Sequence, residues 1–229
     1  MQDTDYTIKP IAHIRSPFSE KFGIPRQSNI VNEVVSTVVF EPEFRNADSL
    51  RGIEEFGFLW LIWQFSANLR EQWSPTVRPP RLGGNQRVGV FATRSPFRPN
   101  ALGLSSVRLL DVDWHSPDGP LLSLGGADLL DRTPIFDIKP YLPYTDSHAD
   151  APSGFAASPA NRLLVVDFPQ PLLEKIPHQL REQLSQLLAN DPRPAYHDDP
   201  ERVYGMVYES VNVRFKVSDD GVLSVVNIF

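Results

Sequence analysis

The chain has 229 residues, a formal net charge of −6 at pH 7 and no cysteine. This length allows one large domain or two small ones with a sizeable core, and the absence of cysteine excludes disulfides and thiolate metal sites. The acidic balance argues against broad, non-specific binding to nucleic acid.

Targeting and metal-binding signals are missing from the sequence. The N-terminus is acidic and lacks the apolar core of a signal peptide. The longest apolar run, residues 56–65, is about half as long as a membrane-spanning helix requires. The five histidines are scattered without ligand spacing. We therefore expect a soluble, cytoplasmic protein with no membrane or metal partner.

The N-terminal part of the chain is dominated by patterns typical of strands. The 22 prolines favour short strands and ordered loops over long helices. A helix is predicted at 44–57, ending at Gly57, and an irregular connection at 74–84. The run at 56–65 is expected to be a strand buried on both faces. Strands are predicted at 6–15, 34–42, 56–65, 87–92, 102–114 and 119–130.

The C-terminal part has a different organisation. Residues 146–160 gather Ser, Ala, Pro and Gly, which predicts a linker. A strand at 163–168 and an amphipathic helix at 176–191 follow. Residues 203–229 then predict two or three strands with a hairpin at Asp220-Gly221. The fold class is therefore mainly β, with an N-terminal β-barrel domain at 1–145 and a small C-terminal α+β domain at 161–229.

Several common catalytic signatures are absent. The sequence has no G-x-G-x-x-G, no G-x-x-x-x-G-K-[ST] and no G-x-S-x-G motif. These absences exclude Rossmann and P-loop sites in their usual form and a serine nucleophile elbow.

An arginine-rich segment stands out against the acidic composition. From Gln72 to Leu110 there is no Asp, Glu or Lys, whereas Arg78, Arg81, Arg87, Arg94, Arg98 and Arg108 all lie there. Arginine is favoured over lysine for bidentate recognition of phosphate or carboxylate. The pattern indicates a specific anionic partner; the alternative is that these arginines lie on different faces and are simply solvated.

Three polar clusters lie in loop-like positions, at 25–27, 93–100 and 127–141. Each by itself is explained by a loop that is structured through hydrogen bonds to its own backbone. Together they indicate a site for an anion or a nucleotide, without defining a reaction. Trp60 and Trp63 are expected to belong to the core.

The runs KFGIPRQ, VRPPRLGG, GVFATRSPFRPNALGLS and LLDRTPIFDIKPYLP occur in this order and resemble the TsaA-like family of tRNA methyltransferases. The resemblance covers about residues 6–145, and DPRPAY with YGMVYESVNVRF fits the longer bacterial form. It implies a homodimeric β-barrel enzyme that uses S-adenosylmethionine. Its implied substrate is tRNA, at N6 of N6-threonylcarbamoyladenosine 37. Two alternatives are a non-catalytic module that binds S-adenosylmethionine or a nucleotide, and a small-molecule methyltransferase.

The chemistry of the implied methyl transfer suggests catalytic residues, and the resemblance gives the cofactor positions. Asp137 is the expected acceptor of the N6 proton, its other possible role being to cap its own turn. Arg98 is expected to clamp an RNA phosphate or the substrate carboxylate, the alternative being that it braces its loop. Tyr141 completes the catalytic set, and residues 161–229 are expected to grip tRNA. The cofactor positions are Pro25, Arg26, Gln27, Ser66, Ala67, Arg94, Leu104, Asp128, Leu130, Asp131, Arg132 and Thr133.

The sequence departs from the family pattern at two of these places. Ser66-Ala67 stands where many relatives carry a histidine and a polar partner. Arg132 replaces a glycine that is common in the D-G-T-P turn.

Overall fold

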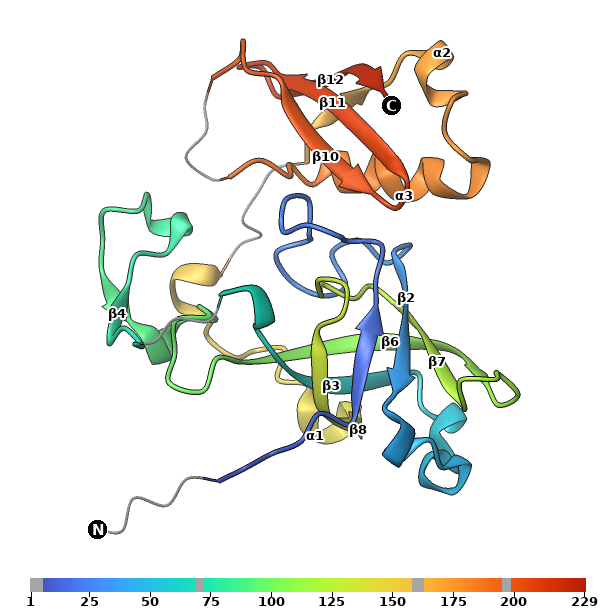
Figure 1. Cartoon of the computed structure of the whole chain (residues 1–229). Helices are drawn as coiled ribbons and strands as arrows, with labels where there is room; N and C mark the ends of the chain where they lie inside the picture. The colour runs from blue at the N-terminus through green and yellow to red at the C-terminus, as the bar shows by residue number, and fades with distance from the viewer. Residues whose placement is uncertain (1–5, 69–71, 158–162, 195–198) are drawn as a thin grey trace.

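A computed structural model (Figure 1) describes residues 6–68, 72–157, 163–194 and 199–229. The chain is mainly β with little helix, as predicted, and its strands form a larger N-terminal sheet and a smaller C-terminal sheet.

The N-terminal sheet has six antiparallel strands in the order β1-β2-β7-β6-β3-β8, and β8 pairs back with β1, so that the ladder is closed. Its interior holds the apolar residues that alternate along each strand, such as Ile14, Leu59, Leu61 and Leu124. The strands are β1 (Ala12–Arg15), β2 (Val35–Phe40), β3 (Phe58–Gln64), β6 (Leu102–Asp113), β7 (Leu121–Gly125) and β8 (Pro134–Pro140).

The strand in the apolar run is present, but its predicted burial on both faces is wrong. In β3, buried and partly buried residues alternate, because only one face of the closed sheet looks into the core. Leu59, Leu61 and Trp63 point inward, whereas Phe58, Trp60 and Ile62 are partly exposed.

The helix predicted at 44–57 is also wrong. The segment forms three 3₁₀ turns, η1 (Pro42–Phe44), η2 (Ala47–Leu50) and η3 (Ile53–Glu55). The side chain of Asn46 accepts a hydrogen bond from the amide of Asp48 at 2.9 Å, and Gly52 takes a left-handed φ of 85°. Both features stop a continuous helix from forming, because the asparagine competes locally for a backbone donor and the glycine reverses the chain.

The arginine-rich segment forms a small two-stranded ribbon of β4 (Thr76–Val77) and β5 (Val88–Gly89). The strand predicted at 87–92 is thus short, and it continues as the 3₁₀ turn η6 (Val90–Ala92). The remaining short elements of this half are η4 (Ser66–Asn68), η5 (Pro80–Leu82), α1 (Pro143–Asp146) and η7 (Gly154–Ala156).

The C-terminal unit has a four-stranded sheet in the order β10-β11-β12-β9, in which β9 (Val165–Asp167) runs parallel to β12. The predicted helix is α3 (His178–Ala189), which buries Leu184, Leu187 and Leu188, and a short α2 (Gln170–Leu173) precedes it. The predicted hairpin joins β11 (Val211–Val217) to β12 (Val222–Ile228), and β10 is Tyr204–Tyr208.

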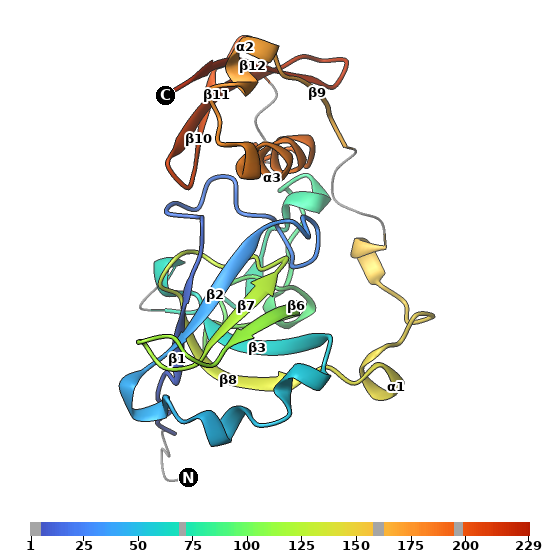
Figure 2. The same ribbon diagram turned by 90° about the vertical axis from the view of Figure 1, so that its right-hand side faces the viewer.

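The segment between β1 and β2, residues 16–34, joins the two units (Figure 2). Phe18, Val31 and Val34 are buried in the core of the C-terminal unit. The ring of Phe22 lies 6.4 Å from those of Tyr204 and Phe215. The apolar core of the C-terminal unit therefore contains residues from the N-terminal part of the chain. The predicted linker at 146–160 lies partly outside the described residues.

Backbone hydrogen bonds reinforce this junction. The amide of Glu209 donates to the carbonyl of Pro17 at 3.1 Å, and the amide of Val207 donates to Oε1 of Glu20 at 3.2 Å. The 16–34 segment is consequently held against the C-terminal unit by one of its carbonyls and one of its carboxylates, as well as by its aromatic rings.

Gly23 offers a direct test of this junction. It has a φ of 91°, and a Cβ at this position would lie 2.4 Å from Sδ of the buried Met206. We expect Gly23→Ala to lower the free energy of unfolding by about 1–2 kcal/mol for backbone strain and by a further ~1–3 kcal/mol for overpacking.

Gly52→Ala is the matched control, since Gly52 has a φ of 85° and a Cβ there would meet nothing within 4 Å. Urea unfolding measures both variants. Equal losses for the two would contradict a tight contact between Gly23 and Met206.

Candidate functional site

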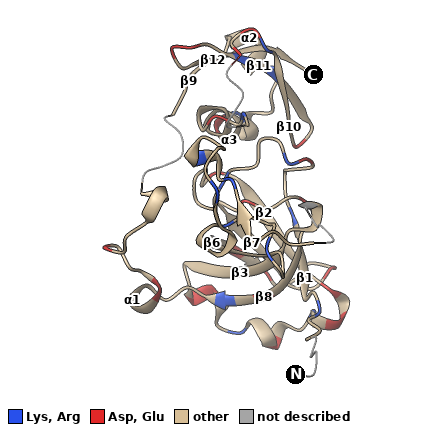
Figure 3. Cartoon of the chain, turned by 90° about the vertical axis from the view of Figure 1, so that its left-hand side faces the viewer, with Lys and Arg blue, Asp and Glu red and all other residues tan. Residues whose placement is uncertain are grey.

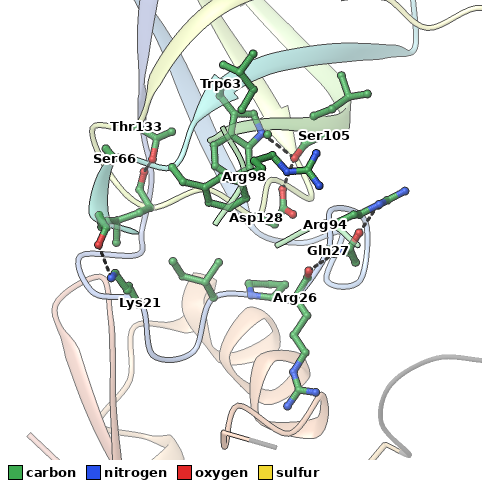
Figure 4. A pocket seen from close by; sticks show the side chains of 18 of the residues that line it. Lys21, Arg26, Gln27, Trp63, Ser66, Arg94, Arg98, Ser105, Asp128 and Thr133 are labelled. Carbon is green, nitrogen blue, oxygen red and sulfur yellow. Dashed lines mark hydrogen bonds between the residues drawn. The ribbon is translucent and has the colours of Figure 1, made fainter. Parts of the chain in front are cut away.

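A cavity of about 480 Å³ is lined by residues 21–27 of the 16–34 segment and by the adjoining ends of β3 and β6 (Figure 4). Its volume suits a small-molecule ligand. Its lining comprises Lys21, Ile24, Pro25, Arg26, Gln27, Trp60, Trp63, Phe65, Ser66, Ala67, Arg94, Arg98, Leu102, Gly103, Leu104, Ser105, Asp128, Leu130 and Thr133.

Most of the expected site residues come together in this cavity. Of the twelve expected cofactor positions, only Asp131 and Arg132 are outside the lining, and Arg98 is inside it. The three polar clusters, which are distant in the sequence, thus meet at one place. Asp137 and Tyr141 do not belong to the lining.

The polar centre of the cavity is a partly buried carboxylate, that of Asp128. Nε1 of Trp63 donates to Oγ of Ser105 at 3.0 Å, and that hydroxyl donates to Oδ1 of Asp128 at 2.7 Å. Burial raises the pKa of Asp128 above its usual 3.8, although the Ser105 hydroxyl and the charge of Arg94 oppose this shift. Asp128 therefore holds a proton more readily than a solvated carboxylate does.

A glycine allows this chain of hydrogen bonds to form. Trp63 of β3 pairs with Gly103 of β6, and a Cβ on Gly103 would lie 2.3 Å from the indole ring. Because the ring rests directly on the strand backbone, its Nε1 reaches Ser105 two residues further along β6. Trp63 is thus a core residue, as expected, and also part of the cavity wall.

Sequence reasoning missed Trp63 and Ser105 as site residues, and Lys21 as well. A glycine inside the strand at 102–114 was the available signal for the first two, since it marks a close approach of another group. Lys21 carried no comparable signal. Its Nζ donates to the carbonyl of Ala67, which links the 16–34 segment to the turn after β3.

Lys and Arg positions occur along the ribbon between the N-terminal sheet and the C-terminal unit (Figure 3). Two of these basic residues, Arg26 and Arg94, line the cavity (Figure 4). Arg94 donates through Nη1 to Oε1 of Gln27, which joins the 93–100 loop to the 16–34 segment. Arg26 donates through Nη2 to the carbonyl of Arg193 at 3.0 Å. The C-terminal unit therefore contacts Arg26, a residue that lines the cavity.

Arg98 binds its own loop. Its Nε donates to the carbonyl of Ser95 at 3.0 Å, and its Nη2 donates to those of Val90, at 3.3 Å, and Thr93. This arrangement agrees with the alternative in which Arg98 braces the loop. Two of its guanidinium nitrogens are therefore engaged by the backbone of its own loop.

The four expected site residues outside the lining have structural partners. Asp137 lies 2.8 Å from Nζ of Lys139, and Tyr141 packs 5.5 Å from the ring of Trp60. Asp131 accepts a hydrogen bond from the amide of Ser16 at 2.9 Å. Arg132 has a φ of 62°, the left-handed conformation for which glycine is favoured.

Two further properties concern the described ranges as a whole. There, no cluster of three or more His, Cys, Asp or Glu side chains is arranged to hold a metal ion. Among the same residues, no helix has the length and apolar character needed to cross a membrane.

Comparisons with known proteins agree with this architecture. Residues 13–147 match the tRNA-methyltransferase O N-terminal domain, and residues 166–229 match the TrmO C-terminal domain. A tRNA (adenine(37)-N6)-methyltransferase of Escherichia coli K12 is 42% identical over 226 residues, which cover 95% of this chain and 96% of that protein.

Two comparisons come from Pseudomonas aeruginosa. A protein named as an S-adenosylmethionine-dependent methyltransferase is 39% identical over 230 residues and covers 97% of each chain. The crystal structure of TrmO from this organism superimposes with a TM-score of 0.77 at 33% identity, covering 99% of this chain and 100% of that one.

The raised pKa of Asp128 predicts how the free energy of unfolding depends on pH. Because the pKa of Asp128 is raised in the folded state, the folded chain binds a proton at this carboxylate more tightly than the unfolded chain does. Between the usual pKa of 3.8 and the raised value, the free energy of unfolding therefore falls as the pH rises.

Asp128→Asn removes this dependence. We expect wild type to lose stability relative to Asp128→Asn as the pH is raised from acidic to neutral, measured by urea unfolding across the range. A constant difference between the two proteins would show that Asp128 is not perturbed by burial.

The strained turn yields a second prediction. Arg132 is 89% exposed at its side chain, and its left-handed backbone costs about 1–2 kcal/mol. Glycine relieves this strain, but its greater conformational freedom in the unfolded chain lowers the free energy of unfolding by roughly 0.5–1 kcal/mol. We expect Arg132→Gly to raise the melting temperature slightly. Arg132→Ala is the control that keeps the strain, and it must not stabilise the protein to the same extent.

Proposed function

Because the chain belongs to the tRNA-methyltransferase O family, we propose that it transfers a methyl group from S-adenosylmethionine to N6 of adenosine 37 in tRNA. One observation carries this proposal. A single cavity gathers ten of the twelve expected cofactor positions around the partly buried carboxylate of Asp128, with guanidinium groups at its mouth.

The chemistry of the lining fits S-adenosylmethionine. Trp63, Phe65 and Leu104 provide apolar surface for a nucleoside. Arg94 and Arg26 carry the positive charge that a methionine carboxylate requires. When bound, S-adenosylmethionine supplies a methyl group on a sulfonium sulfur, which a nitrogen nucleophile can displace. Positioning and electrostatics then account for most of the acceleration that the chain itself has to provide.

We assign to Asp128, rather than to Asp137, the role of accepting the proton that N6 loses during methyl transfer. Among the described residues that line the cavity, Asp128 is the only carboxylate, whereas Asp137 pairs with Lys139 outside it. A carboxylate with a raised pKa is a better proton acceptor than a solvated one. Ser105 and Trp63 act as positioning residues, because they hold Oδ1 of Asp128 in one orientation.

The finer features are part of the same proposal. The substrate is the N6-threonylcarbamoyl form of adenosine, whose carboxylate suits the guanidinium groups at the cavity mouth. The closed six-stranded sheet is the catalytic β-barrel, residues 161–229 assist tRNA binding, and the enzyme is a cytoplasmic homodimer. The cytoplasmic location is proposed because the substrate, tRNA, is found in the cytoplasm.

The decisive experiment incubates purified protein with S-adenosylmethionine and tRNA that either carries or lacks the threonylcarbamoyl group. Nucleoside mass spectrometry should show a methyl group on adenosine 37 of the modified tRNA. Binding of S-adenosylmethionine without transfer would instead indicate a non-catalytic module. Transfer only to small molecules would indicate the other alternative.

Arg94 provides a sharper test within the cavity. A charge-assisted hydrogen bond contributes about 1.5–3 kcal/mol, so Arg94→Gln should weaken S-adenosylmethionine binding roughly ten- to a hundredfold in calorimetry. Arg51→Gln, on the exposed η2 turn away from the cavity, is the matched control and should bind as wild type does. If both variants bind equally well, Arg94 does not contact the cofactor.

A further inference from the structure

The base of the β4–β5 ribbon carries two uncovered aromatic rings. Trp73 is 49% exposed and Phe91 is 75% exposed. Their ring centroids are 6.2 Å apart, and the ring planes differ by 24°, so that the rings are stacked. Two large apolar side chains in this state form a flat surface of the kind that binds another planar group.

The backbone holds this pair firmly in place. The amide of Val90 donates to the carbonyl of Pro75 at 3.0 Å, and Val90 itself is buried. The amide of Ser74 donates to the carbonyl of Phe97 at 3.0 Å. Each ring is thus next to a residue whose backbone is held by a hydrogen bond. Little conformational entropy is therefore lost at these rings when a ligand binds.

Arginines flank the rings along the chain, two at the far end of the ribbon and one beside the cavity. Thr76 pairs with Gly89 and Val77 with Val88, so Arg78 and Arg87 follow at the far end of the ribbon. Arg94 lies three residues after Phe91, at the mouth of the cavity. The side chains of all three arginines are exposed. Along the chain from Gln72 to Leu110 there is no acidic residue to offset them.

We propose that Trp73 and Phe91 stack against an unpaired nucleotide next to the target adenosine, while Arg78 and Arg87 contact the phosphates that follow. This proposal rests on the proposed function and names the surface through which the RNA is held. Single-stranded nucleic acid is bound by this combination of aromatic rings and a positively charged track. A nucleotide must also leave its stack before an enzyme can reach its base.

Charge favours RNA over a second copy of the chain as the occupant. In a two-fold contact through the ribbon, the same surface of both copies would meet. Arg78 and Arg87 of one copy would then approach the same arginines of the other, which is unfavourable. A polyanion satisfies those charges and also supplies the planar bases.

The test measures the affinity of Trp73→Ala and Phe91→Ala for a labelled anticodon stem–loop RNA by fluorescence anisotropy. Stacking of one base on an aromatic ring changes affinity by roughly 5- to 150-fold, so each variant should lose affinity within this range. Trp73→Phe, which keeps an aromatic ring, should recover most of it. Calorimetry with S-adenosylmethionine should give the wild-type affinity for all three variants.

Two further variants separate stacking from charge. Tyr144→Ala removes an aromatic ring that is 87% exposed on α1 and should leave RNA affinity unchanged. Arg78→Gln should weaken binding and reduce the slope of log affinity against log salt by about 0.7–0.9. Trp73→Ala should leave that slope as it is in wild type.

Three outcomes would overturn the proposal. One is RNA affinity that does not respond to Trp73→Ala or Phe91→Ala. Another is an equal loss in Tyr144→Ala, which would indicate general stickiness. The last is a change of oligomeric state in Trp73→Ala by light scattering, which would identify a second copy as the occupant. Wild-type protein that binds neither S-adenosylmethionine nor tRNA would contradict the proposed function itself.

Discussion

The insertion of residues 16–34 into the C-terminal core is the contact on which the site depends. Phe18 and Phe22 belong to the same apolar cluster as the inner residues of the C-terminal sheet. The stretch between Lys21 and Gln27 supplies one wall of the cavity. A loop of this length would lose much conformational entropy on being ordered by a ligand alone. Because its apolar side chains are packed elsewhere, its polar side chains are already placed.

This arrangement gives the C-terminal unit a part in the cavity as well as in any contact with RNA. Arg26 reaches the carbonyl of Arg193, and Gly23 lies against Met206. A ligand that shifts β10 would therefore also shift the residues around Arg26. The sequence alone predicts two separate duties for the two domains, whereas the packing couples them. Such coupling is reciprocal wherever it affects binding free energies.

Asp128 is a site residue whose ionisation lowers the stability of the folded chain. A carboxylate in this position is costly to ionise, as its raised pKa shows. The Ser105 hydroxyl donates to one of its oxygens and itself accepts from Trp63, and Gly103 is needed to let the indole ring come close enough. Three residues are thus committed to orienting one destabilising group. Buried, perturbed groups of this kind are typical of functional sites.

Arg94 and Arg98 have similar surroundings in the sequence but different partners in the structure. Their sequence environment marks both as candidates for an anion, since neither has an acidic neighbour. In the folded chain, Arg98 turns back onto three carbonyls of its own loop, whereas Arg94 crosses to Gln27. The difference arises from the path of the backbone after η6, which no spacing rule describes. Similar residues four positions apart can therefore have unrelated partners.

The sequence by itself determined the mainly β class, most strand positions, the helix α3 and the family, because alternation, β-branched runs and long collinear motifs are local properties. It failed where local signals compete, as at 44–57, where Asn46 and Gly52 replace a helix by 3₁₀ turns. Only the tertiary structure decided that Asp128 is partly buried beside Ser105 and that Asp137 is not in the cavity. It alone also placed the 16–34 segment in the C-terminal core. These outcomes depend on contacts between residues far apart in the chain, and the energy of such contacts is set by the closed sheet and its packing rather than by neighbouring residues.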